Sequence, residues 1–249
     1  DKIYWLLEDC KKFGTLPFAG LARCAFISTE ILNSFVEEKI FTENDKLKFL
    51  ASIKTVTTEL NEDLNKNKKK FLGKYGHLRP GTYEITSLNY KKNFKNYFSN
   101  YSNSKKVIRK NYNYKFSQKQ KNSIKKFIMK KKNYKNFNEL IFFIKSSIKY
   151  REYSKFIFSK SIDLTFENLE NFGKKFDIKK EDLSYLNIHK FLDLYFNLSN
   201  FKSLDSLKKN ILENKKKYFK NQNINLPDII TSEKDLFVQN RKKPKINFI

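Results

Sequence analysis

Residues 138–172 read NELIFFIKSSIKYREYSKFIFSKSIDLTFENLENF, and this stretch decides the fold class. Its apolar residues recur at helical spacing. Arg151 and Lys155 fall on the apolar face of the expected helix, because residues four apart stack. The stretch therefore predicts a long helix with two cations where core residues are expected. The apolar residues that share this face are Leu140, Ile144, Ile148, Phe158 and Ile162.

Apolar residues at three- and four-residue steps predict further helices on both sides. Thr42 is expected to cap one of them, Ser203 another, and Ser117 begins a Ser-x-x-Gln capping box. The spacing of the apolar residues falls toward two only near residues 226–238, LPDIITSEKDLFV. This spacing predicts two short strands around a turn. These further helices are expected over residues 18–36, 42–64, 117–128 and 203–218, with one or two short helices over residues 183–198.

The expected fold is thus mainly α, a single multi-helix domain over residues 1–249 with a short β-hairpin near its C-terminus. Residues 89–114 are polar and aromatic without a clean period, so this segment is expected to be irregular and partly mobile. An irregular glycine-rich loop is expected between the helices, at GKYGHLRPGTYEI, residues 73–85.

Three of the chain's six glycines lie in residues 73–85. Gly73 and Gly76 are expected to end the preceding helix with positive φ values, which other residues resist. Gly76 and Gly81 would let the backbone approach a ligand closely. His77 offers a titratable ring, and Arg79 a fork for phosphate or carboxylate.

Each of these features also has a purely structural interpretation. His77 could cap a helix end while Arg79 pairs with a carboxylate. Arg151 and Lys155 could be long side chains at a helix edge with their charges in water. Arg23, one turn beyond Gly20 in FGTLPFAGLAR, could lie at the rim of a close helix contact.

The formal net charge of +26 is large, but it is spread along the whole chain. Lysine supplies 47 of the 52 basic residues, beside abundant Asn, Phe, Ile and Tyr. Biased genome composition explains this pattern better than a nucleic-acid surface does. The scarce arginines are more informative, because their fixed fork is not interchangeable with lysine. They are Arg23, Arg79, Arg109, Arg151 and Arg241.

Two cysteines, Cys10 and Cys24, lack a CxxC spacing and are expected to be free thiols. No signal peptide or run of about 18 uncharged apolar residues is apparent, which predicts a cytoplasmic protein without a membrane partner. The sequence begins with Asp1 and ends in KPKINFI, and we expect it to be part of a longer polypeptide.

Four segments of the chain together resemble segments of a known family and occur in the same order. The resemblance runs from Tyr4 to Ile249 and is weakest between Lys91 and Tyr114. The chain resembles the central region of phosphoenolpyruvate synthase-like proteins, the group that includes rifampicin phosphotransferase and L-glutamine kinase. The segments are FGTLPFAGLARCAFISTEILNS, YGHLRPGTYEITS, IKYREYSKFIFSKS and the closing LPDII, DLFV and INFI.

This resemblance implies one part of an ATP-dependent, dikinase-like phosphotransferase. Such enzymes combine an ATP-grasp domain that uses ATP and Mg, a swivelling domain whose histidine carries the phosphoryl group, and a helical domain that binds the acceptor. The chain is similar to the last of these and would have no turnover alone. L-glutamine or a pyruvate-like acceptor is favoured over a large antibiotic, and no metal or cofactor is expected in this segment.

The roles implied by the resemblance fall on named residues. Arg151 and Lys155 match the family's helical Arg and Lys, and His77 or Glu84 would be the general base. His77, Arg79, Arg151 and Lys155 are expected to line one concave surface. The alternatives are a lysine-rich nucleic-acid-binding helical module and a scaffold domain without a ligand. The residues expected to bind acceptor or phosphoryl group are Arg23, Arg79, Thr82, Arg151, Glu152 and Lys155, with Gly76 and Gly81 shaping the loop.

Overall fold

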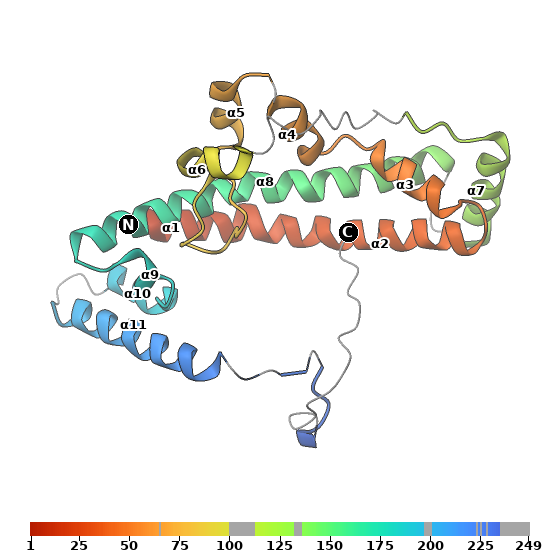
Figure 1. The fold of residues 1–249 in the computed structure, drawn as a ribbon. Helices are drawn as coiled ribbons and strands as arrows, with labels where there is room; N and C mark the ends of the chain where they lie inside the picture. The colour runs from red at the N-terminus through yellow and green to blue at the C-terminus, as the bar shows by residue number, and fades with distance from the viewer. Residues whose placement is uncertain are drawn as a thin grey trace. The chain divides into compact units, whose positions relative to one another are not determined.

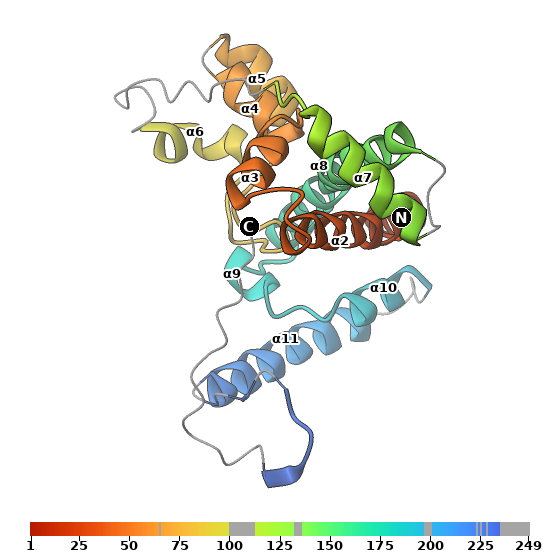
Figure 2. The ribbon, with the colours of Figure 1, turned by 90° about the vertical axis from the view of Figure 1, so that its right-hand side faces the viewer.

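The computed structural model shows a mainly helical chain, as the sequence predicts (Figures 1 and 2). It divides into two compact units, Asp1–Ser184 and Tyr185–Ile249, where the sequence had predicted one domain. Each unit is described by itself. The structure describes residues 1–64, 66–99, 113–131, 136–196, 201–222, 224, 226–227 and 229–234.

The longest element is helix α8, Phe137–Lys175, which confirms the helix predicted from the opening stretch. Asn136 caps its start, because the side-chain oxygen accepts a hydrogen bond from the Glu139 backbone N–H at 2.9 Å. Lys174 and Lys175 lie in its last turn, where cations favour the negative end of the helix dipole. With 39 residues, α8 is long enough to contact most other elements of the first unit.

The N-terminal helices run antiparallel to α8 (Figure 1). Helix α1, Lys2–Asp9, continues through a π-helical turn, Cys10–Thr15, into α2, Leu16–Glu37. The Ser28 hydroxyl donates to the Ser147 hydroxyl at 3.1 Å across the contact between α2 and α8. The π-helical turn also packs on α8, since a Cβ at Gly14 would lie 2.6 Å from the Cβ of Phe158. Only glycine fits this contact.

One apolar core lies at the end of this helix pair. It joins α2 and α8 to α3, Glu43–Ala51, and α7, Gln118–Lys131. The expected cap at Thr42 and the expected capping box at Ser117 are both present: the Thr42 hydroxyl accepts from Asp45 N, and the Ser117 hydroxyl accepts from Gln120 N. The most deeply buried members of the core are Leu32, Phe35, Phe49, Ile124, Leu140 and Ile144.

The helix predicted over residues 42–64 is broken in two. Helix α3 ends at Ala51, and α4 spans Val56–Leu64. The backbone N–H of Ser52 and Ile53 bond to carbonyls three residues earlier, which tightens the chain into a turn. The apolar spacing continues through this turn, so the sequence pattern alone did not reveal it.

A second group of short helices covers another part of α8. Helix α5 spans Lys68–Tyr75, and α6 spans Tyr90–Phe98 from an Asn89 cap. Phe71 and Tyr75 pack on Phe156 of α8. Residues 90–98 form short helical pieces with a kink at Asn93, where the sequence had predicted an irregular segment. Residues 100–112 of that segment lie outside the described ones.

The remaining helices follow α8 in the chain. Helix α9, Lys180–Leu183, closes the first unit, and the second unit holds α10, Ile188–Phe196, and α11, Phe201–Asn221. Because α11 begins at Phe201, Ser203 lies inside the helix and is not its cap. The described part of residues 226–234 contains no strand, so the β-hairpin is not supported there, and residues 235–238 lie outside the described ones.

The N-terminal helices pass one test for a membrane span. Lys2–Glu37 is long enough and apolar enough to cross a membrane by length and composition, although core helices of soluble proteins pass the same test. Only 17% of its most apolar window is buried within the structure. Phe13, Leu16 and Phe26 are exposed along it.

Candidate functional site

The connection between α5 and α6, residues 76–89, consists of turns and bends that return the chain to its starting point. Gly76 ends α5 with ordinary helical dihedral angles, φ −59° and ψ −24°, and Gly73 lies inside the helix. No described glycine has a positive φ, so the expected glycine-rich loop is not supported. The ends of the connection are joined instead, because Lys91 N donates to Gly76 O at 3.0 Å.

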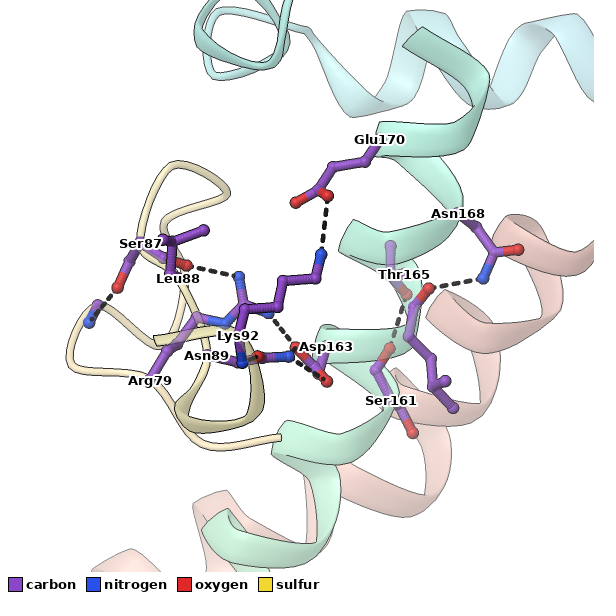
Figure 3. Close-up of polar contacts among 12 residues, drawn as sticks. Arg79, Ser87, Leu88, Asn89, Lys92, Ser161, Asp163, Thr165, Asn168 and Glu170 are labelled. Carbon is purple, nitrogen blue, oxygen red and sulfur yellow. Dashed lines mark hydrogen bonds and ion pairs between the residues drawn. The ribbon is translucent and has the colours of Figure 1, made fainter. Parts of the chain in front are cut away.

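A buried ion pair fastens this connection to α8 (Figure 3). The Arg79 guanidinium donates to Asp163 Oδ1 of α8 and, at 3.0 Å, to the Ser87 carbonyl oxygen. It also lies over the Phe166 ring, 4.9 Å from the centroid. The arginine fork is therefore occupied by partners within the chain, which is the structural interpretation that the sequence left open.

Asn89 completes the partners of Asp163. Its amide nitrogen donates to both carboxylate oxygens, at 3.0 and 3.2 Å, while its amide oxygen caps α6 by accepting from Lys92 N. Further along α8, Glu170 binds Lys92 and Lys180, each at 2.9 Å. These contacts hold the start of α6 against one face of α8.

His77 lies beside this network and contacts α8 through its ring. Its Nε2 lies 3.1 Å from the Phe156 carbonyl oxygen. Because a carbonyl only accepts, Nε2 carries the proton of the neutral ring and Nδ1 keeps the lone pair. Burial lowers the pKa of His77 most, the bond to Phe156 O opposes this, and the charge of Lys160 lowers the pKa further. His77 is consequently a neutral base near pH 7.

His77 also lines a groove of about 840 Å³ between α5, the start of α6 and α8. Four lysines line the same groove: Lys68, Lys69, Lys91 and Lys160. Its acidic residues are Asp163, which is already paired with Arg79, and Glu167. Leu72 and Leu164 give it apolar walls. The groove therefore combines excess positive charge, an apolar surface and a neutral imidazole.

Gly76, which was expected to shape the loop, also lines the groove, whereas the remaining residues expected at the site lie outside its lining. Arg23 is exposed on α2, and Lys155 is exposed on α8. Arg151 is also exposed, and its guanidinium lies 5.8 Å from the centre of the Phe26 ring on α2. Glu152 accepts a hydrogen bond from Thr57 at 3.2 Å. The helical Arg and Lys are thus exposed and do not line the groove with His77.

Thr82 and Glu84 lie in the connection itself. Glu84 is exposed, and its backbone N–H bonds to Gly81 O at 3.0 Å in a turn. A Cβ at Gly81 would lie 2.5 Å from the Glu84 carboxylate, so this turn is tight. Neither Thr82 nor Glu84 lines the groove.

Sequence reasoning missed most of the residues that line the groove. Lys160, Leu164 and Glu167 lie on the same helix as Arg151 and Lys155. Leu164 is four residues after Lys160, and Glu167 is three residues after Leu164. That spacing is a signal for one helix face and could have found them. Lys68 and Lys69 belong to the NKNKKK run, which resembles any other lysine run in this chain.

No protein family matches the chain, and no curated protein or solved structure does so either. Among the residues that the structure describes, no three His, Cys, Asp or Glu side chains are grouped as a metal site would require. Both cysteines are free thiols, and burial raises the pKa of Cys10. The groove is accordingly the candidate functional site.

Proposed function

We propose that this chain is the acceptor-binding part of an ATP-dependent, dikinase-like phosphotransferase, as its resemblance to the phosphoenolpyruvate synthase-like family implies. In this proposal other domains of the same polypeptide bind ATP and Mg and carry the phosphoryl group on a histidine. The observation that carries the proposal is the position of a neutral His77 in a groove lined by four lysines.

The chemistry of phosphoryl transfer accounts for this arrangement. The transferring group carries negative charge on its equatorial oxygens, so positioned cations supply most of the stabilisation. Lys160 lies close enough to His77 for its charge to lower the pKa of the ring. The acceptor must also lose a proton, and a neutral imidazole with its lone pair on Nδ1 is a suitable general base.

The geometry also shifts the expected roles within the chain. Arg79 is neutralised by Asp163, so it positions the connection that carries His77. Arg151 and Lys155 lie outside the groove lining. The proposal therefore assigns the phosphoryl-binding role to Lys160 and the proton-accepting role to His77.

Two assays on the full-length polypeptide test this assignment. Lys160→Gln and His77→Gln should each reduce transfer to the acceptor by about 10²- to 10³-fold, the cost of one transition-state contact. Formation of phosphohistidine from ATP should stay within about twofold of the unmodified protein, because that step uses other domains. Lys174→Gln, an exposed lysine in the last turn of the same helix, is the control.

Two results would refute the proposal. One is a full-length reading frame without an ATP-grasp region and a carrier histidine. The other is measurable ATP hydrolysis or acceptor phosphorylation by this chain alone, since the proposal places both the nucleotide and the phosphoryl carrier elsewhere. Equal losses in both assays for either variant would count against the assignment of that residue.

A further inference from the structure

One face of α8 forms the floor of the groove. This floor carries a positive charge at one end and a negative charge at the other. Lys160, Leu164 and Glu167 all line the groove. Spacings of four and three residues place them on one helix face. At 1.5 Å per residue, the seven steps from Lys160 to Glu167 span about 10 Å along the helix. A ligand that lies along this floor meets a cation at one end and a carboxylate at the other.

Lys160 marks the end of the groove where His77 lies. Its Nζ is 5.2 Å from the centre of the Phe156 ring, and the Phe156 carbonyl is the partner of His77 Nε2. No carboxylate among the described residues forms a salt bridge with Lys160. Its ammonium is therefore available for an anionic group beside the imidazole.

Glu167 marks the other end of the groove. It is half-buried, yet none of the described residues forms a hydrogen bond or ion pair with it. The carboxylates on either side are both satisfied: Asp163 by Arg79 and Asn89, and Glu170 by Lys92 and Lys180.

Glu167 thus differs from the two neighbouring carboxylates of α8, although basic residues outnumber acidic ones two to one in the chain. Lysines line the same groove, but none is within salt-bridge distance of Glu167. Half-burial of a carboxylate costs solvation free energy that a partner normally offsets. A cationic group on a ligand would supply that partner.

We infer that the acceptor carries an ammonium group that Glu167 binds, while its reacting end lies at Lys160 and His77. Leu72 and Leu164 line the space between and would contact an aliphatic spacer. A Cβ built on Gly73 meets no atom within 4 Å, so the wall is open beside it. This inference rests on the proposed function and selects amines or amino acids over pyruvate-like keto acids.

A matched pair of probes tests the inference on the chain itself. 6-Aminohexylphosphonate carries a phosphonate and an ammonium separated by an extended aliphatic chain, and hexylphosphonate lacks only the amine. Isothermal titration calorimetry should show the aminophosphonate binding about tenfold more tightly, as expected for a hydrogen-bonded ion pair at a half-buried site.

Three variants assign this difference to its residues. Glu167→Gln should remove the tenfold preference and leave hexylphosphonate binding unchanged or slightly tighter. Glu181→Gln, an exposed carboxylate on α9, should keep the preference and controls for net charge. Lys160→Gln should weaken both probes by a similar factor. Thermal unfolding of each variant checks that the fold is retained.

Negative results for the ammonium subsite can be told apart from negative results for the proposed function. Equal affinity for both probes would overturn the ammonium subsite while leaving the anion-binding groove, and thus the proposed function, in place. A preference that survives in Glu167→Gln would also overturn the subsite. Absence of binding by either phosphonate would overturn the groove itself and, with it, both proposals.

Discussion

Arg79 and Asp163 lie 84 residues apart in the sequence and form an ion pair whose side chains are only 5% and 9% exposed. The pair joins the connection after α5 to the middle of α8. Removal of one partner leaves the other as a buried charge without compensation, which is far more costly than loss of a surface ion pair.

We therefore expect Arg79→Ala to lower the free energy of unfolding by about 3–5 kcal/mol. The matched control is Arg151→Ala, which removes an exposed guanidinium from α8 and should cost less than about 1 kcal/mol. Urea denaturation monitored by circular dichroism measures both. Similar values for the two variants would show that the pair is not structurally important.

A second prediction concerns pH. The folded-state pKa of His77 is lowered by burial and by Lys160, so the unfolded chain takes up a proton at higher pH than the folded chain does. The contribution of His77 to stability is therefore present above pH 6.5 and decreases as the pH falls toward the folded-state pKa. An NMR titration of the His77 ring should show a midpoint below 6.5, and His77→Gln should flatten the pH dependence of stability below that value.

Two glycines in the N-terminal helices should respond to alanine in opposite directions. In Gly14→Ala the new Cβ would meet the Phe158 Cβ, an atom fixed close to the α8 backbone, so we expect a loss of about 1–3 kcal/mol. In Gly20→Ala the new Cβ meets nothing within 4 Å, so the higher helix propensity should add about 0.5–1 kcal/mol. Thermal melts of the two variants test this, and shifts of the same sign would contradict it.

Diffuse positive charge predicts weak and unselective binding of nucleic acid. Because such binding depends on counterion release, we expect affinity for a random DNA duplex to fall roughly a thousandfold between 50 and 200 mM salt. Fluorescence anisotropy with several unrelated RNA and DNA sequences measures it. Tight, sequence-dependent binding at physiological salt would instead favour the nucleic-acid module that the sequence left open.

Helices with a continuous apolar face could be predicted from the sequence. The bounds expected for α8 differ from those in the structure by at most three residues, because the apolar period continues through nearly its whole length. The turn after Ala51 was missed, because the apolar spacing continues across it without a glycine or proline. Helix α5 was missed, because its first turn belongs to the lysine run NKNKKK, which follows directly on the helix expected over residues 42–64.

The site could be predicted only in part. His77 was found because histidine is rare in this chain, and it does line a groove. The Arg79 partner could not be identified, because Asp163 is one of 26 acidic residues and nothing in its local pattern points to a position 84 residues away. The apolar residues predicted to share one face of α8 are buried or half-buried, but the two cations were wrongly placed on that face. Arg151 and Lys155 are exposed, whereas Ser147 and Ser159 are buried.

The antiparallel contact between α2 and α8 has a consequence for synthesis of the chain. A ribosome adds about 5–20 residues per second, and roughly 100 residues separate the end of α2 from the start of α8, so α2 would emerge about 5–20 s before its partner. During that interval Leu32 and Phe35, which are completely buried in the folded protein, lack the part of their cover that α8 supplies. We therefore expect the nascent chain to need chaperones that shield apolar helices until translation reaches α8.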